Sequence, residues 1–359
     1  MKVLTVIATM GTGGAEAIVT ALVTAADTQG EQACVASAGG WRSELLAEAG
    51  VEQLSIPLAT RRVRELGLAV LRLRRWIAEH GPDVIHAHNV KASAVAALAR
   101  GSSGIPIVTT LHGLAGYAGA ARVLARCSDL VVAVSEHVAA ELCAHRYPAA
   151  RLRVIENAIT PLPVHERSRA RRRLSIPDAS RVVVSLARFA PQKRHDLLIE
   201  AWRSTRADAV LLLAGDGPTR VDVERSVVAA GLAQRVHLLG ERQDPDWLLA
   251  AADIAVLSTD WEGLPVSLLE AMSVGVPVVA SRVGGVAEVL ADAACLVEPG
   301  SAGALASGLN ALLDDASARA ELAARGRTLV ASRFDPQRMF AAYRQLYDGL
   351  CGSGVGGAQ

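Results

Sequence analysis

Short apolar runs rich in β-branched residues alternate along the chain with longer segments whose apolar residues recur three and four positions apart. The first pattern is typical of buried strands and the second of amphipathic helices. Their alternation predicts an α/β protein with parallel sheets covered by helices on both faces. Ten strands in two groups are expected, at residues 2–8, 51–56, 83–88, 105–112, 129–135, 181–187, 209–215, 235–240, 253–258 and 276–281.

A stretch without strand pattern, "NAITPLPVHERSRARRRLSIPDAS", separates the two groups. Its prolines and arginines indicate a domain boundary. We therefore expect two doubly wound, Rossmann-like domains, residues 1–164 and 165–335, that face each other across a cleft. A helix at about 336–350 is expected to pack back on the first domain, and 351–359 to form a disordered tail. Open α/β sheets bind ligands at the carboxyl ends of their strands, so the cleft is the expected substrate site.

Composition narrows the class of protein. The net charge of +1 argues against an electrostatic nucleic-acid binder. The basic run Arg167–Arg173 is either a nucleic-acid patch or, as we favour, the solvated start of a helix. Five cysteines without a CxxC pair indicate reduced thiols and a cytoplasmic protein, and an apolar start followed by glycines fits a buried strand better than a signal peptide.

Residues 61–77 combine six arginines with apolar residues at helical spacing, among them Val63, Leu66 and Leu73. A basic amphipathic helix of this kind can lie on an anionic membrane. An ordinary helix that covers the first sheet with a solvated basic face has the same pattern. Peripheral contact with the inner face of the membrane therefore stays open as an alternative.

The segment "MGTGGAE" follows the first strand and opens the first helix. Gly13 and Gly14 allow close backbone approach, and the helix N-terminus offers N–H groups to an anion. A tight turn without a ligand is the alternative. A dinucleotide fingerprint needs Gly or Ala where Glu16 stands, and no GxxxxGK[ST] motif occurs, so a nicotinamide or flavin cofactor and P-loop chemistry are not expected.

The segment "DWEGLPVSLLEAMSVGVPVVAS" places Glu262 in a loop after a strand and Glu270 in the helix that follows. Pro265 suits the first helical turn. The free N–H groups at this helix start suit phosphate oxygens, whereas the two carboxylates suit sugar hydroxyls. A nucleotide sugar carries phosphates between two sugars. The N–H groups of Leu264, Val266 and Ser267 are expected to hold phosphate oxygens, and the donor-binding segment is expected to comprise Gly263, Leu264, Pro265 and Val266.

The diphosphate of such a ligand also needs cations. Arg188 and Lys193 follow another strand, in "LARFAPQKRHDLL". Arginine can contact phosphates in a bidentate manner and lysine as a point charge, and both stabilise charge on a leaving group.

These motifs, with "AGDGP" and "GVPVVASRVGGVAEVL", resemble the retaining GT-B glycosyltransferases of glycosyltransferase family 4. The resemblance covers essentially the whole chain. It implies that Glu262 contacts the donor sugar, that Glu270 binds the donor ribose, and that Arg188 and Lys193 hold the diphosphate. It also places Gly13 and Gly14 near donor phosphate and acceptor. His112, in "TTLHGL", would face the donor sugar. We thus expect a catalytic set of His112, Arg188, Lys193 and Glu262.

Other family positions are Ser135, Glu136 and Asn157. The common Pro-Asn-Gly form around Asn157 is here Glu156-Asn157-Ala158. The resemblance implies retention of anomeric configuration, with the leaving phosphate helping to deprotonate the acceptor. It also implies that no metal or other cofactor is needed.

The acceptor side is expected in the first domain, near Glu16, His86, His88 and Asn89. Two histidines two positions apart can ligate zinc, but no third ligand stands near them. The acidic pair in "DPD", Asp244 and Asp246, is expected to cap a helix that begins near Pro245 rather than to bind metal.

The expected activity is transfer of a hexose or hexosamine from a nucleotide diphosphate sugar, most commonly UDP-linked, to a hydroxyl group. The acceptor can be a glycolipid or polyprenyl intermediate, a growing polysaccharide or a natural-product aglycone. A GT-B-fold sugar-nucleotide epimerase and a noncatalytic nucleotide-sugar-binding subunit are the alternatives. Neither nucleic acid nor metal is expected as a partner.

Overall fold

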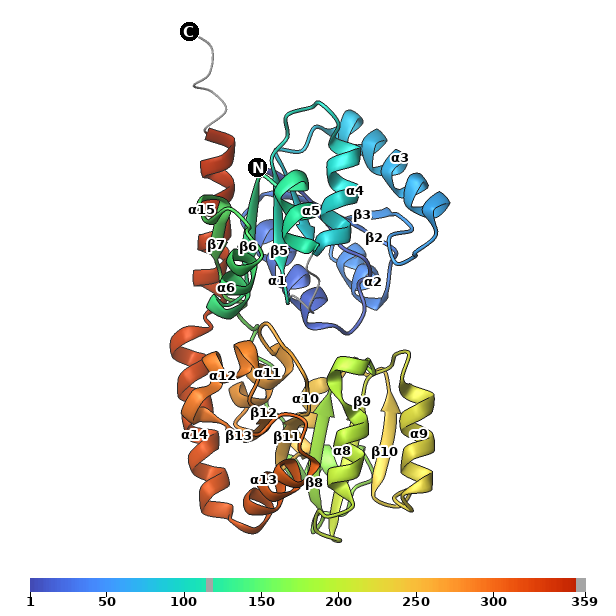
Figure 1. The fold of residues 1–359 in the computed structure, drawn as a ribbon, viewed down its shortest axis with the longest axis vertical. Coiled ribbons are helices and arrows are strands. Elements are labelled where there is room, and N and C mark those ends of the chain that lie inside the picture. The colour runs from blue at the N-terminus through green and yellow to red at the C-terminus, as the bar shows by residue number, and fades with distance from the viewer. Residues whose placement is uncertain (114–118, 353–359) are drawn as a thin grey trace. The chain divides into compact units, whose positions relative to one another are not determined.

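The computed structural model describes residues 1–113 and 119–352, which form two compact α/β units (Figure 1). Unit 1 contains Met1–Ala158 together with the chain from Pro336 onward, and unit 2 contains Ile159–Asp335. The boundary thus falls a few residues before the expected one at 164. The C-terminal helix, α15 (Pro336–Gly352), belongs to unit 1. Cys351 and Gly352 end this helix instead of opening a tail, and the rest of the expected tail, 353–359, lies outside the described residues.

Unit 1 is built on a seven-stranded parallel sheet in the order β3-β2-β1-β4-β5-β6-β7. Its strands are β1 (Lys2–Val6), β2 (Gln32–Ser37), β3 (Glu52–Ser55), β4 (Val84–His88), β5 (Ile107–Leu111), β6 (Leu130–Ala133) and β7 (Leu152–Val154). The sequence pattern missed two of them. β2, "QACVAS", is built from small residues, and β7 has three residues at the sheet edge, so neither carries a strong apolar signal.

Helices cover both faces of this sheet. They are α1 (Gly14–Thr28), α2 (Trp41–Glu48), α3 (Val63–His80), α4 (Val90–Arg100), α5 (Ala120–Cys127), α6 (Glu136–Ala144) and α15. One core joins Leu4 and Ile85 of the sheet to Leu73 of α3 and Ala96 of α4. A second core, on the opposite face, joins the sheet to α1 and α2. Successive residues of a strand point to opposite faces, which is why one strand serves both cores.

Unit 2 has a six-stranded parallel sheet in the order β10-β9-β8-β11-β12-β13. Its strands are β8 (Arg181–Leu186), β9 (Ala209–Ala214), β10 (Val236–Gly240), β11 (Ile254–Leu257), β12 (Val278–Ser281) and β13 (Cys295–Val297). The last strand was not predicted, because three residues are too few for a periodic signal.

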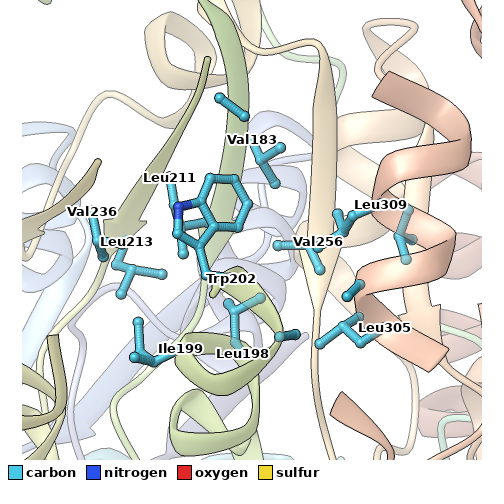
Figure 2. Packing of buried hydrophobic residues seen from close by; sticks show 14 of the residues in the cluster. Val183, Leu198, Ile199, Trp202, Leu211, Leu213, Val236, Val256, Leu305 and Leu309 are labelled. Atoms are coloured by element: carbon cyan, nitrogen blue, oxygen red, sulfur yellow. The ribbon is translucent and has the colours of Figure 1, made fainter. Parts of the chain in front are cut away.

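The helices of unit 2 are α7 (Arg167–Arg173), α8 (His195–Trp202), α9 (Arg220–Ala229), α10 (Pro245–Ala251), α11 (Val266–Ser273), α12 (Gly284–Leu290), α13 (Ala302–Asp314) and α14 (Ala316–Arg333). Figure 2 shows Trp202 of α8 among apolar side chains of the sheet, with Leu305 and Leu309 of α13 beside Val256. The indole of Trp202 is fully buried. At about 25 cal/mol per Å² of buried apolar surface, such large side chains dominate the stability of the unit.

The basic run at the start of unit 2 is not uniformly solvated, which corrects the expectation for Arg167–Arg173. Arg171 is 1% exposed, and its Nη2 donates to Asp253 Oδ2 at 3.0 Å. Its Nε also donates to the Ala251 carbonyl oxygen, and Arg167 pairs with the same Asp253 carboxylate. Arg172 is exposed. Part of this run therefore attaches α7 to the sheet, and its burial leaves less charge for a nucleic-acid patch.

The basic helix α3 packs Leu73, Trp76 and Ile77 into unit 1. Val63, expected on its apolar face, is instead 83% exposed. Leu68 and Leu71 are also exposed on this helix. Across the residues that the structure describes, none of the helices has the length and apolar character needed to span a membrane.

Candidate active site

The strand order of unit 2 reverses between β8 and β11, and ligands of open α/β sheets bind at such a switch point. Arg188 and Lys193 lie in the loop after β8, and Glu262 lies in the loop after β11. These loops leave the carboxyl ends of adjacent parallel strands. The fold thus brings together the two sequence motifs that were expected to hold a nucleotide sugar.

Lys193 Nζ donates to Glu262 Oε2 across these two loops. The two side chains are only 17% and 14% exposed, so the ion pair is largely removed from water. Arg188, in contrast, is exposed. The site therefore offers one half-buried cation beside a carboxylate and a second cation open to solvent, a set that suits a phosphate next to a hydroxylated group.

Two hydroxyl residues that the sequence analysis did not single out join the loops. Ser258 Oγ donates to the carbonyl oxygens of Lys193 and Arg194, at 3.0 Å each. Thr259 Oγ1 donates to the Gln192 carbonyl oxygen at 2.9 Å. Both side chains are 1% exposed. Their only sequence signal was a polar Ser-Thr pair directly after an apolar strand.

The "AGDGP" segment after β9 supports the loop that carries Arg188. A β-carbon at Gly215 would come within 2.1 Å of the Ala187 carbonyl oxygen, and one at Gly217 within 2.3 Å of the Phe189 carbonyl oxygen. The Phe189 N–H donates to the Asp216 carbonyl oxygen at 2.9 Å. Only glycine permits this close approach of two backbones, so the segment acts by fixing the Arg188 loop.

A similar close approach fixes the turn at Glu262. Gly285 N donates to the Glu262 carbonyl oxygen at 3.1 Å. The helix after the turn, α11, begins at Val266, one residue later than expected, with Pro265 as its N-cap. Its first N–H groups have no acceptor within the helix. The side chains of Leu264 and Val266 are buried, so these two residues have only backbone groups to offer a ligand.

Glu270 lies in the second turn of α11 and is half-buried. Glu262 lies in the loop before this helix, so the two glutamates stand on the loop and on the helix, as expected. The structure thus places the expected donor-site residues of unit 2 on the loops after β8 and β11 and on α11.

In unit 1 the side chain of Glu16, from the first turn of α1, folds back against the glycine loop that follows β1. Thr9 Oγ1 donates to Glu16 Oε1 at 3.0 Å, and a β-carbon at Gly13 would lie 2.0 Å from Glu16 Oε2. Gly13 is the N-cap of α1, and Gly14 is its first residue. The Glu16 carboxylate therefore lies against Gly13, and its negative charge makes this helix end better suited to a neutral hydroxyl than to an anion.

Three histidines of unit 1, His86, His88 and His112, lie side by side. The ring centroids of His86 and His88 are 4.2 Å apart, and His88 Nδ1 lies 3.1 Å from His112 Nε2. His86 was expected at the acceptor side, but it is 1% exposed, and both ring nitrogens bond inside the unit, to Tyr347 and Thr110 at 2.7 Å. His86 is thus a core residue. His112 directly follows β5 and is partly exposed.

Burial controls the protonation of these rings. Desolvation lowers the pKa of His112 to about 4 and that of His86 to about 3. All three imidazoles are therefore neutral near pH 7, since the pKa of His88 is also lowered well below its ordinary value. A neutral His112 can exchange hydrogen bonds with a ligand but is a weak base.

Several other expected residues serve as helix caps. Asn89 has a φ of 103°, and its side chain accepts from Ala92 N at 2.9 Å. Ser135 caps α6 by accepting from Val138 N. The side-chain oxygens of Asn89 and Ser135 therefore accept hydrogen bonds from backbone N–H groups. Glu136 is exposed in the first turn of α6, and Asn157 is buried, with no hydrogen-bond partner for its Oδ1 among the described residues.

The acidic residues of the "DPD" segment pair with basic side chains. Helix α10 begins at Pro245, as expected, but Asp244 makes no capping bond and instead pairs with Arg242 at 2.8 Å. Asp246 pairs with His165. Within the described ranges 1–113 and 119–352, no group of three potential ligands gathers around a possible metal position.

Two parallel-sheet units, with cations and carboxylates at the switch point of the second, define a glycosyltransferase of the GT-B type. Residues 12–161 match the family described as Glycosyltransferase Family 4, and residues 166–329 match Glycosyl transferases group 1. The chain is 30% identical over 282 residues to N-acetyl-alpha-D-glucosaminyl L-malate synthase of Bacillus anthracis, covering 74% of each protein. It belongs to glycosyltransferase family 4.

Other relatives extend this comparison. The lipopolysaccharide core biosynthesis glycosyltransferase LpsE of Rhizobium meliloti is 28% identical over 340 residues, which cover 93% of this chain and 95% of that protein. Among solved structures, Anabaena Alr3699/HepE in complex with UDP-glucose has a TM-score of 0.87 at 24% identity, with 97% of this chain and 100% of that one covered. At this identity the structural likeness shows the fold.

Proposed function

We propose that the chain is a retaining glycosyltransferase that moves a hexose or hexosamine from a UDP-linked sugar to an acceptor hydroxyl, without a metal ion. The observation that carries this proposal is the largely buried ion pair of Lys193 and Glu262 at the switch point of unit 2, with the exposed Arg188 on the same loop as Lys193. In the proposed complex Arg188 and Lys193 neutralise the diphosphate, and Glu262 accepts from hydroxyls of the transferred sugar. Glu270 accepts from the ribose.

The choice of UDP rests on relatives. The HepE structures contain UDP, glucose or UDP-glucose according to their descriptions. A Corynebacterium glutamicum relative, 37% identical over 184 residues, is instead described as GDP-mannose-dependent. UDP and GDP are therefore the two nucleotides to compare first, and the sugar is then identified by assaying the sugar conjugates of the nucleotide that binds.

Unit 1 would bind the acceptor. Glu16 at the N-terminus of α1 favours a neutral hydroxyl there over a phosphate or carboxylate group. His112, neutral near pH 7, would donate or accept a hydrogen bond at the sugar. Because so weak a base cannot readily take the acceptor proton, its low pKa supports a mechanism in which the leaving phosphate does so.

The proposal includes a cytoplasmic location and a peripheral contact with anionic membrane through 61–77. Exposed Leu68 and Leu71 share α3 with Arg64 and Arg75, which are also exposed, as an interfacial helix requires. Co-sedimentation with vesicles that contain anionic lipid, compared with neutral vesicles, tests this part. Equal recovery of the protein in the supernatant with both vesicle types would exclude it.

The experiment that tests the function is thermal unfolding with UDP, GDP, ADP and dTDP in the presence of EDTA. A nucleotide at 100 times its Kd stabilises the folded state by about 2.7 kcal/mol, so one of the four should raise the Tm. Glu270→Ala should lose this shift. Glu321→Ala, which removes an exposed ion pair with Arg325 on α14, should keep it.

Activity is then measured as release of the stabilising nucleotide from its sugar conjugates, with acceptors supplied. Product analysis by NMR of the anomeric proton distinguishes retention from inversion. Nucleotide binding with conversion of the donor to an isomeric donor, in the absence of any acceptor, would favour an epimerase instead. Failure of all four nucleotides to stabilise the protein would remove the basis of the proposal.

A further inference from the structure

His86, His88 and His112 lie on one face of the sheet of unit 1. His86 and His88 are two positions apart on β4, and Thr110 and His112 are two positions apart at the end of β5, so all four side chains share a face. The rings of His88 and His112 are nearly parallel, with centroids 5.4 Å apart and an interplanar angle of 16°. This arrangement links a buried histidine to the one at the strand end.

His88 differs from its neighbours in its hydrogen bonds. It is 1% exposed, and its Nδ1 lies 3.1 Å from His112 Nε2. Its Nε2 is buried and has no hydrogen-bond partner within the described part of the chain. His86, equally buried, has partners at both nitrogens. Among the residues that the structure describes, His88 therefore has a single hydrogen-bond partner, and that partner is His112.

The single contact decides where the protons lie. Both rings are neutral, so one nitrogen of the pair donates and the other accepts. If His112 donated, His88 would carry its hydrogen on Nε2, and a buried N–H would lack an acceptor. Unpaired buried donors are rare and costly. The alternative leaves only an acceptor lone pair unused on His88, so His88 donates from Nδ1 to His112 Nε2.

We propose that His88 is a positioning residue for the transfer reaction, because it fixes His112 as the tautomer that carries its hydrogen on Nδ1. His112 then presents an uncharged N–H donor to an oxygen of the sugar. This inference rests on the proposed function for its catalytic meaning, but the tautomer itself is a property of the protein alone. A carboxylate in place of His88 would draw the hydrogen to His112 Nε2 and favour a charged ring.

The direct test is ¹⁵N NMR of the full chain labelled at histidine, at pH 7. Two-bond ¹H–¹⁵N correlations report which ring nitrogen carries hydrogen. Both His88 and His112 should appear as Nδ1–H tautomers, assigned through His88→Leu and His112→Ala. In His88→Leu the His112 signals should move toward the Nε2–H form. A wild-type His112 that carries its hydrogen on Nε2 would overturn the proposal.

Matched variants separate positioning from packing. Asparagine can place an N–H donor near the position of histidine Nδ1, whereas leucine cannot. His88→Leu should lower kcat for UDP release from UDP-glucose about ten-fold or more without changing the affinity for UDP, and His88→Asn should restore much of the loss. Tyr347→Phe removes one buried hydrogen bond, to His86, and should lower the Tm while leaving kcat and the His112 tautomer unchanged.

Equal kcat in His88→Leu and His88→Asn, both folded, would also overturn the proposal. Failure of the proposed function looks different. In that case no nucleotide stabilises the wild-type protein and no nucleotide sugar is consumed, while the NMR spectra still decide the tautomer of His112.

Discussion

Gly285 lies directly against the carbonyl oxygen of Gly263, and a β-carbon at position 285 would approach that oxygen to 1.7 Å. The N–H of Gly285 also donates to the Glu262 carbonyl oxygen. The start of α12 therefore fixes the backbone of the turn that carries Glu262. The sequence does not predict this contact, because Gly263 and Gly285 lie more than twenty positions apart.

Gly285→Ala should weaken donor binding. The new methyl group cannot fit against the Gly263 oxygen, so the turn at Glu262 must move by more than 1 Å to reach an ordinary contact distance. We expect the Kd for UDP to rise about ten-fold or more, together with a stability loss of about 1–3 kcal/mol. Calorimetric titration with UDP and urea unfolding measure the two effects.

Gly303→Ala in α13 is the matched control. The nearest atom to a β-carbon at position 303 is Ser301 Oγ at 4.0 Å, so the methyl group has room. This variant should bind UDP like the wild type. Wild-type affinity in Gly285→Ala as well would mean that the turn does not shape the donor site.

Glu262→Gln should separate nucleotide binding from sugar transfer. Glu262 competes with phosphate for Lys193 and repels the diphosphate, so its neutralisation should strengthen UDP binding several-fold. The same change weakens hydrogen bonds that the carboxylate would accept from the sugar, so turnover should fall about 100-fold. Titration with UDP and initial rates with UDP-glucose give the two numbers.

Asp260→Asn is the matched control: it tests whether removal of another negative charge from this turn changes UDP binding and turnover as Glu262→Gln does. Asp260 pairs with Arg194 at 2.9 Å, whereas Glu262 pairs with Lys193. Its substitution should change both quantities less than Glu262→Gln does. Weaker UDP binding in Glu262→Gln would show that the carboxylate helps to hold Lys193 in its binding position instead of competing for it.

Much of the fold was predictable because it depends on local pattern. Short apolar runs rich in β-branched residues predicted the central strands of both sheets, such as β1 and β11. The pattern failed at β2, where small residues pack in the interior without a strong apolar signal, and at the three-residue strands β7 and β13. In these strands, pairing with a neighbour determines the structure more than composition does.

The chemical groups of the candidate site were also predictable, because charged residues after strands must meet at one sheet edge. Their partners were not. The buried position of Arg171, the bond between His88 and His112, and the place of Glu16 over Gly13 all depend on tertiary contacts between side chains. His86 and His88 show the limit most clearly: both are 1% exposed, but His86 bonds to Thr110 and Tyr347 whereas His88 bonds to His112.

His195 should make unit 2 less stable in acid. It is 3% exposed and stacks on Phe189, and burial lowers its pKa to about 4, with Lys193 as a further cause. In the unfolded chain its pKa is about 6.5. Below pH 6.5 the unfolded state therefore binds a proton that the native state does not. The lowered pKa of His195 therefore leaves the free energy of unfolding unchanged above pH 6.5. As the pH falls from 6.5 to about 4, it lowers that free energy by about 3 kcal/mol in total.

His195→Phe should remove this pH dependence while keeping the stacked contact with Phe189. Urea unfolding at pH 7 and pH 5 should show a smaller difference in the free energy of unfolding than in the wild type, by roughly 1–2 kcal/mol. His237→Gln, at an exposed position on β10, should retain the wild-type difference. A wild-type difference in His195→Phe would mean that His195 titrates normally in the folded protein.

Gly67 and Gly81 should respond to alanine in opposite directions. Gly67 is an exposed position inside α3 with no atom within 4 Å of a β-carbon, so alanine should stabilise the helix by about 0.5–1 kcal/mol. Gly81 ends the same helix with a φ of 53°, in the left-handed region, so alanine there should destabilise it by about 1 kcal/mol. The Tm values of the two variants, measured together, check both signs, and a lower Tm for Gly67→Ala would contradict the prediction.

Arg171→Met should be the most destabilising single change in the basic run of α7. Arg171 and Asp253 are both nearly buried, and the methionine removes the arginine charge while leaving the Asp253 carboxylate inside with Arg167 and the Val182 N–H. Breaking a buried pair at one side costs about 3–5 kcal/mol, although the remaining partners of Asp253 place the expected value at the lower end. Arg172→Ala, the adjacent exposed position, should stay within about 0.5 kcal/mol of the wild type. Urea unfolding of both variants distinguishes a core position from a solvated one. Equal stabilities would show that residues 167–173 form a solvated surface. A large loss of stability only in Arg171→Met would show that this arginine belongs to the core of unit 2.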